Sequence, residues 1–110
     1  MADLTGKKVA FLLKRGVEQP ELTEPWAAVE LAGGRPVLVS EEHGTITALL
    51  GDWDRGDDFT VDLTLDEANP DDYAALVLPG GTLNSDKIRR NPKAIAFVRA
   101  FMDAGKPVAS

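Results

Sequence analysis

The 110-residue sequence contains no cysteine and only one histidine, His43. The missing thiols exclude a disulfide framework, a thiolate metal site and a cysteine nucleophile within these residues. One histidine gives little support to a zinc site or to a Ser-His-Asp triad. Since His43 lies in the polar segment Glu41-Glu-His-Gly44, we expect it to be a solvated loop residue. The sequence therefore predicts neither a metal nor a cofactor.

Long apolar runs are missing as well. No segment approaches the roughly 20 apolar residues that a membrane helix needs. The first eight residues, Met1 to Lys8, contain no apolar stretch of the kind found in secretory signals. We therefore expect a cytoplasmic protein with no membrane partner. Hydrophobic residues make up 44% and charged residues 27%, which is typical of a single globular domain.

Basic residues are scarce in one part of the chain. The net charge of the chain is −6. The segment from Glu41 to Asp72 contains eleven carboxylates and one basic residue, Arg55, so its local net charge is −10. Such a surface repels the phosphates of nucleic acids, so we expect no nucleic-acid partner. The simplest interpretation is a solvated acidic face that keeps the protein in solution.

Apolar segments alternate in a way that predicts an α/β fold. Three short apolar runs predict strands buried on both faces: 8–14, 36–40 and 74–78. Segment 21–32 predicts a helix that ends at Gly33-Gly34, with Pro25 either in its first turn or kinking it. Strand, helix and strand in this order form a right-handed βαβ unit, so we predict an open, doubly wound parallel sheet.

The rest of the chain completes this plan. Thr45–Leu50 and Phe59–Asp62 predict short strands that form a small hairpin or an excursion off the main sheet. Thr64 with Glu67 predicts a capped helical turn over 65–68. Asn91 is a predicted N-cap with Pro92 at the first helical position. The apolar stripe of that helix comprises Ala94, Ile95, Phe97, Val98, Phe101 and Met102.

A fourth apolar strand begins at Pro107 and reaches Ser110, the last residue. A central strand that stopped there would bury a charged terminus beside the sheet, which is costly. We therefore expect residues 1–110 to be the N-terminal part of a single domain. Ligands of open α/β sheets bind at the C-terminal ends of the strands, which draws interest to the segments after 8–14 and 74–78.

Two of these segments carry candidate chemistry. Glu18 and Glu21 flank Pro20 where the first helix begins. Glu21 could face the cleft and share a proton with a neighbour, or it could simply stabilise the helix N-terminus. Gly80 and Gly81 follow a buried strand and could present backbone N–H groups to an oxyanion, or merely form a tight turn. They are not part of a G-x-G-x-x-G dinucleotide motif.

Other residues are less distinctive. Asp86 could serve as a catalytic acid or could lie on the surface at the start of a short helix. Trp26 and Phe97 fit core or interface packing better than base stacking. Trp53 lies among acidic residues and could be an exposed interface residue.

Four segments together resemble a known group of proteins: 16–22, 61–64, 72–81 and 104–110. They resemble the PfpI-like intracellular protease and general stress protein group, within the class I glutamine-amidotransferase-like (DJ-1/PfpI) superfamily. The resemblance implies a flavodoxin-like sheet sandwiched by helices. It also implies a nucleophilic cysteine on a strand-to-helix elbow just after the strand that begins at Pro107, and so just past Ser110.

The resemblance assigns roles to residues present here. Glu21 matches the carboxylate that hydrogen-bonds the cysteine and helps to hold it as a thiolate. Gly80 and Gly81 match the turn that donates backbone N–H groups to the oxyanion. Asp86 falls near the acid that reaches the catalytic histidine of a neighbouring subunit, although the family has glutamate there. A homo-oligomer, dimeric or higher, is implied as well.

The resemblance implies a cysteine-dependent hydrolase or stress-protection protein. It would be an intracellular peptidase, or a deglycase or glyoxalase-like enzyme, acting on small carbonyl, glycated or peptide substrates. Residues 1–110 alone would then be inactive. The alternative is a non-enzymatic chaperone or interaction protein on the same fold. A nucleotide-binding or receiver domain fits less well, because no phosphate-cradling loop follows the first strand.

Overall fold

The computed structural model describes residues 4–51, 54–79 and 90–109. Strands and helices alternate along the chain, as the sequence predicts. Their bounds are β1 (Lys8–Leu12), α1 (Gln19–Leu31), β2 (Arg35–Ser40), β3 (Thr45–Leu50), β4 (Asp54–Thr60), β5 (Leu63–Thr64), the 3-10 turn η1 (Pro70–Asp72), β6 (Ala75–Val77), α3 (Pro92–Asp103) and β7 (Val108–Ala109).

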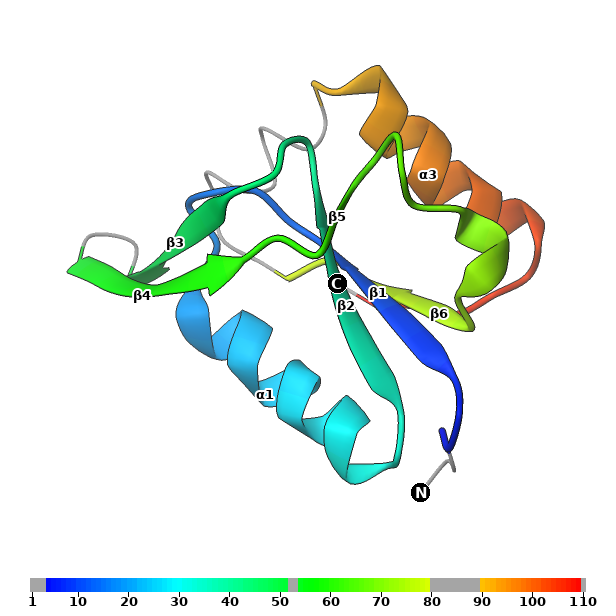
Figure 1. Cartoon of the computed structure of the whole chain (residues 1–110), viewed down its shortest axis with the longest axis horizontal. Helices are drawn as coiled ribbons and strands as arrows, with labels where there is room; N and C mark the ends of the chain where they lie inside the picture. Colours follow the sequence, from blue (N-terminus) through cyan, green and yellow to red (C-terminus); the bar gives the residue numbers. More distant parts are fainter. Residues whose placement is uncertain (1–3, 52–53, 80–89, 110) are drawn as a thin grey trace.

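Five of the strands form a parallel sheet in the order β5-β2-β1-β6-β7. β1 lies at its centre, and Phe11 is in register with Leu38 of β2 on one side and Val77 of β6 on the other. α1 and α3 lie on opposite faces of this sheet (Figure 1). β3 and β4 form a separate antiparallel hairpin. The predicted parallel α/β architecture is therefore confirmed.

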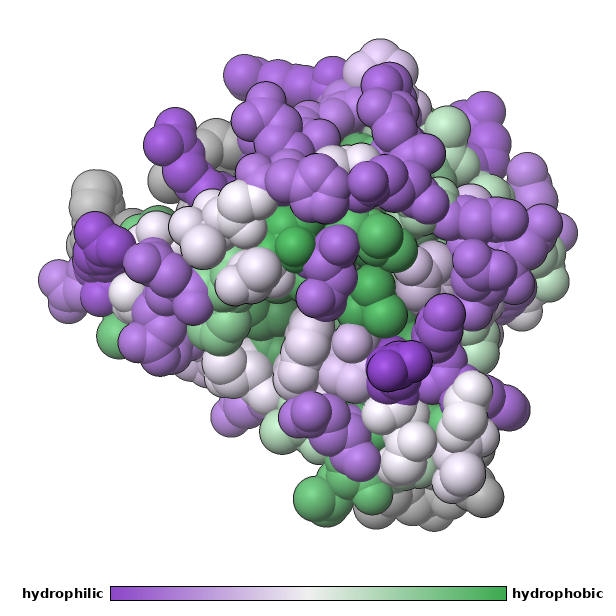
Figure 2. All heavy atoms as spheres, viewed as in Figure 1, coloured by the Kyte–Doolittle hydropathy of each residue, from purple (hydrophilic) through white to green (hydrophobic). Residues whose placement is uncertain are grey.

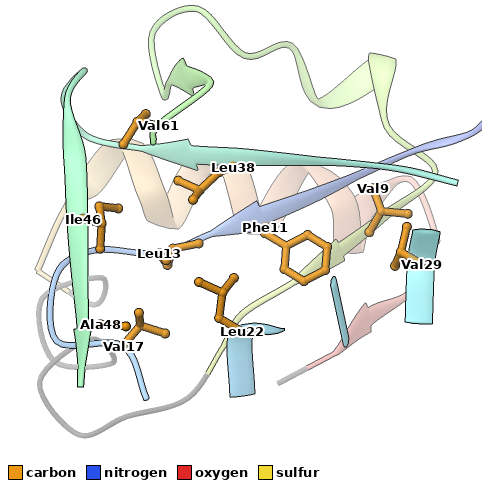
Figure 3. Close-up of a cluster of buried hydrophobic side chains, with 10 residues drawn as sticks. All are labelled: Val9, Phe11, Leu13, Val17, Leu22, Val29, Leu38, Ile46, Ala48 and Val61. Carbon is orange, nitrogen blue, oxygen red and sulfur yellow. The ribbon is translucent and has the colours of Figure 1, made fainter. Parts of the chain in front are cut away.

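The side chains of β1 alternate between two hydrophobic cores. Val9 and Phe11, with Leu13 just beyond the strand, belong to the core under α1, whereas Ala10 and Leu12 belong to the core under α3. All five are at most 2% exposed. Figure 3 shows the α1-side core gathering side chains from β1, β2, α1 and β3. Successive strand residues point to opposite faces, so β1 needs cover on both.

Aromatic packing dominates the second core. The rings of Phe97 and Phe101 lie 5.2 Å apart between centroids, and Tyr73 lies 6.4 Å from each of them. Burial raises the pKa of the Tyr73 hydroxyl, with the nearby carboxylates as a second cause. Asn91 caps α3 as predicted, because its side-chain oxygen accepts hydrogen bonds from the N–H groups of residues 93 and 94.

Two predictions about α1 and the hairpin are wrong in detail. α1 begins at Gln19, so Pro20 occupies its first turn and Pro25 lies inside the helix. Proline suits the first turn because the N–H that it lacks would have no helical partner there. β4 extends over the polar residues before Phe59, because pairing with β3 overrides their low strand propensity.

The outer side of α3 is more exposed than the sequence predicts. Ile95 is 45% and Met102 65% exposed, whereas Ala94, Phe97 and Phe101 are buried. β7, expected to be central, is the edge strand of the described sheet, and Val108 is 37% exposed. Within the described residues, no further strand pairs with β7 or extends the sheet beneath this side of α3.

Neighbouring positions on α3 provide a stability test. Phe101→Ala should lower the free energy of unfolding by about 3–5 kcal/mol, because it removes a fully buried ring from an aromatic cluster. Met102→Ala should change it by less than about 0.5 kcal/mol, because that side chain is largely exposed. Urea denaturation followed by circular dichroism measures both. Equal losses in the two variants would contradict the assignment of the buried face.

Candidate functional site

The C-terminal ends of β1, β6 and β7 meet at one edge of the sheet. Strand order changes direction between β1 and β6, since the chain passes from β1 to β2 on one side and returns to β6 on the other. Val77 is paired with Ala109, and the Leu78 N–H donates to the Ala109 carbonyl at 2.7 Å. The crevice at such a switch point is the usual ligand site of open α/β sheets.

The loop that leads from β1 into α1 is held by the β3–β4 hairpin. The Leu49 N–H donates to the Val17 carbonyl oxygen at 2.8 Å. The Gly51 N–H donates to the Glu18 carboxylate, Oε1, at 2.5 Å. Glu18 also forms an isolated parallel bridge with Leu49. The hairpin therefore sets the path of the chain just before α1 begins.

Gln19, the first residue of α1, is fixed by the same hairpin. Its amide nitrogen donates to the Asp57 carboxylate at 2.9 Å, and its amide oxygen accepts from the Asp57 N–H at 2.8 Å. Gly56 permits this approach, because a Cβ there would lie 2.2 Å from the Gln19 oxygen. The two-way amide contact anchors the N-terminus of α1 beside the strand ends.

The two candidate glutamates occupy different environments. Glu18 is half-buried and its carboxylate contacts the hairpin. Glu21 is exposed in the first turn of α1, and its N–H donates to the Glu18 carbonyl at 3.1 Å. The structure thus brings Glu21 to the start of the helix, where a carboxylate also stabilises the helix dipole. Its catalytic role stays a prediction.

Three other predicted site residues lie outside the described part of the chain: Gly80, Gly81 and Asp86. Pro79, which precedes them, is buried at the end of β6. Their proposed roles as oxyanion donors and acid therefore stay predictions. Trp53 also lies outside the described residues.

A network missed by the sequence reasoning joins three elements near the same edge. Lys14, just after β1, forms an ion pair with Glu41, just after β2. The Asn91 side-chain amide donates to the same carboxylate. Glu41 therefore ties the ends of two strands to the N-cap of α3. A sequence signal did exist, because Lys14 ends one predicted strand and Glu41 directly follows another, and the ends of neighbouring parallel strands lie together.

His43 contacts Glu67 across a solvated surface. Its Nε2 lies 2.7 Å from Glu67 Oε1, and the two side chains are 59% and 46% exposed. The Thr64 N–H donates to that carboxylate at 2.9 Å, which is the glutamate half of the predicted capping box. This backbone hydrogen bond lowers the pKa of Glu67, and the neighbouring imidazole lowers it further.

Within the described ranges 4–51, 54–79 and 90–109, no group of three or more histidine or carboxylate side chains could hold a metal ion. None of the helices described there is long and apolar enough to cross a membrane.

Comparison with known families decides the relationship of this chain. The model of the DJ-1/PfpI family matches residues 7–110. The chain belongs to the DJ-1/PfpI family. This membership confirms the resemblance that was recognised from four sequence segments.

Curated members of the DJ-1/PfpI family are similar over nearly the whole chain. The chain is 40% identical over 103 residues to "Deglycase PH1704" of Pyrococcus horikoshii, covering 94% of this chain and 58% of that protein. It is 36% identical over 104 residues to "General stress protein 18" of Bacillus subtilis, with the same coverage of 94% and 58%. The chain thus spans about 58% of the length of these relatives.

Solved structures of the DJ-1/PfpI family share the fold. A two-domain protein of Anabaena variabilis, containing DJ-1/ThiJ/PfpI-like and ferritin-like domains, superposes with a TM-score of 0.82 at 33% identity, covering 94% of this chain and 29% of that one. A mutant of the DJ-1 superfamily protein STM1931 of Salmonella typhimurium gives 0.78 at 29% identity, covering 93% and 53%. The flavodoxin-like α/β fold is therefore confirmed.

Amide hydrogen exchange can distinguish the structural roles of Glu18 and Glu21. Glu18→Ala removes the acceptor of the Gly51 N–H, so that amide should exchange about fivefold faster, as expected for losing about 1 kcal/mol of hydrogen bonding. Glu21→Ala should leave Gly51 exchange unchanged, because that side chain does not contact the hairpin N–H. Amide exchange measured by NMR tests this, and equal effects of the two variants would contradict the described loop geometry.

The His43–Glu67 pair predicts a pH dependence. Because the pKa of Glu67 is lowered, its contacts stabilise the fold above the ordinary glutamate pKa and are lost as pH falls through the lowered value. His43→Gln should raise the pKa of Glu67 only part of the way to normal, since the Thr64 N–H is the larger cause. A carboxyl carbon NMR titration measures this. A fully normal pKa in the variant would contradict the order of causes.

Proposed function

We propose that these residues are part of a cysteine-dependent stress-protection enzyme of the deglycase type. It would act in the cytoplasm on small carbonyl or glycated substrates and would work as a homo-oligomer. The observation that carries the proposal is 40% identity over 103 residues to a protein named as a deglycase. A relative named "Protein/nucleic acid deglycase 2" supports the same activity. The name "General stress protein 18" of another relative supports the stress-protection role.

The arrangement of strand ends supports this proposal. A residue that followed Ser110 would leave β7 on the side of the sheet where β1 and β6 also end. A thiolate at a helix N-terminus has a lowered pKa and becomes nucleophilic. In the proposed reaction, a protonated Glu21 donates a hydrogen bond that helps to stabilise this thiolate.

The proposed chemistry is addition to a carbonyl group. The thiolate attacks the carbonyl carbon, a carbon–sulfur bond forms, the carbon–oxygen π bond breaks, and its electron pair becomes the oxyanion. In a glycated arginine, the bond from the adjacent hydroxyl-bearing carbon to nitrogen then breaks. That hydroxyl becomes an aldehyde as it loses its proton, and the nitrogen takes up the proton as the unmodified peptide leaves. The N–H groups of Gly80 and Gly81 would stabilise that oxyanion. Asp86 would orient a histidine of a neighbouring subunit in the assembled oligomer.

A chaperone without catalysis is the second candidate. Exposed apolar side chains favour it, since Leu31 is 84% and Met102 65% exposed. Apolar groups of this kind can contact unfolded clients without any cysteine. The two candidates differ in whether a nucleophile is needed.

The test uses the polypeptide that continues beyond Ser110. The probe is a peptide whose arginine has been modified by methylglyoxal, and the readout is release of the unmodified peptide. Replacing a cysteine directly after Ser110 with serine should reduce the rate more than about 100-fold, because the reaction loses its nucleophile. Unchanged activity, or another residue at that position, would overturn the enzyme proposal. Cysteine-independent suppression of client aggregation would then support the chaperone.

Glu21→Ala tests the carboxylate role in the same polypeptide. The thiol pKa, measured from the pH dependence of iodoacetamide alkylation, should rise by about 1 pH unit, because the thiolate loses a hydrogen bond worth about 1.5 kcal/mol. Glu24→Ala removes a carboxyl group further along α1 and should leave the thiol pKa unaltered. A rise of equal size in both variants would show that the effect does not come from a hydrogen bond made by Glu21.

A further inference from the structure

A hollow lies along the side of α1, away from the strand ends that form the candidate active site. Its volume is about 320 Å³, at the lower end of the range for small-ligand sites. Its lining residues include Leu22, Trp26, Leu38 and Phe59, with Glu30 and Asp62 contributing carboxylates. Figure 2 shows that apolar residues gather in the middle of one face of the molecule, within a hydrophilic rim. We refer to this site as the α1 hollow.

The lining of the α1 hollow contains two aromatic rings, those of Trp26 and Phe59. Trp26 is only partly buried, and its ring packs on Phe11 with 5.0 Å between centroids and a tilt of 54°. Phe11 is fully buried, so Trp26 rests on a rigid support. Phe59 of β4 is also partly exposed. The hollow therefore offers accessible, preorganised aromatic surface.

A carboxylate is fixed beside these rings. The Leu38 N–H donates to Asp62 Oδ2 at 2.8 Å, and the Asp62 N–H donates to the Leu38 carbonyl at 2.9 Å. Within the described ranges of the chain, no hydrogen bond reaches Asp62 Oδ1, and Glu30 forms no ion pair. Both residues are exposed. The hollow thus presents negative charge, and its described lining contains no cation.

We propose that the α1 hollow binds the side chain of an arginine presented by a partner protein. A guanidinium group stacks on aromatic rings and pairs with carboxylates through its planar N–H groups. The aliphatic stem of arginine can cover the apolar part of the lining. The net charge of −6 favours a cationic partner over an anionic one. Lysine fits less well, because its ammonium is more strongly hydrated and does not stack.

The binding test uses the 110-residue chain with Trp53→Phe, which leaves Trp26 as the single tryptophan, and excitation at about 295 nm avoids the fluorescence of Tyr73. The probe is a blocked Gly-Arg-Gly peptide, and the control peptide has citrulline, which is neutral and nearly isosteric, in place of arginine. We expect saturable change in Trp26 emission with a Kd of about 1–10 mM for the arginine peptide. The citrulline peptide should bind at least about fivefold more weakly, since it lacks the charge.

Three variants locate the site. Asp62→Asn removes the charge but retains an oxygen that can accept from the Leu38 N–H, and Glu30→Gln changes an exposed helical residue, so both should fold. Each should raise the Kd about threefold or more. Glu24→Gln makes the same charge change on α1 outside the lining of the hollow and should leave the Kd unchanged.

Several outcomes would overturn the proposal. If the citrulline peptide bound equally well, binding would depend only on the apolar lining of the hollow. If Glu24→Gln weakened binding as much as Glu30→Gln, binding would depend on the net charge of the protein and not on the hollow. If the wavelength of the Trp26 emission maximum shifted with protein concentration alone, a second copy of the chain would be the partner that covers the hollow. Because none of these readouts measures catalysis, the proposal stands or falls separately from the proposed enzyme activity.

Discussion

Burial of β1 on both faces is the constraint on which the rest of the structure depends. A central parallel strand has no solvated side, so α1 must cover one face and α3 the other. Phe11 and Leu12, neighbours in sequence, are each fully buried in different cores. The same central position sends the C-terminus of β1 to the switch point of the sheet. One requirement of packing therefore also positions the candidate site.

The β3–β4 hairpin supplies a rigidity that the parallel sheet cannot. Loops that follow parallel strands form few hydrogen bonds within themselves. The loop before α1 is instead hydrogen-bonded to the hairpin through Val17, Glu18 and Gln19. The dipole of a helix N-terminus stabilises a nearby negative charge only if the position of the helix N-terminus is fixed. The acidic, polar β4 strand therefore serves the strand-end site through its backbone and through Asp57 rather than through buried apolar area.

Local patterns predicted the strands, the hairpin and the Asn91 cap, because burial on two faces and helix capping leave short-range signatures. Partners distant in sequence left weaker signatures. Lys14 and Glu41 lie at the ends of two predicted parallel strands, whereas Asn91 contacts Glu41 only because the fold brings a helix start to the same place. The exposure of Met102 depends on what lies beside α3, which no helical periodicity encodes. The role of Glu21 rests on resemblance, because its spacing suits a helix dipole equally well.

The division into two cores has a consequence for how the chain assembles on a ribosome. The buried members of the α1-side core are complete at Val61, whereas the other core waits for Phe101. At about 5–20 residues per second, those 40 residues take roughly 2–8 s to synthesise. During that interval one face of the central strand, with Ala10 and Leu12, lacks its helix. The nascent chain can therefore bury one face of β1 before the helix that covers the other face has been synthesised.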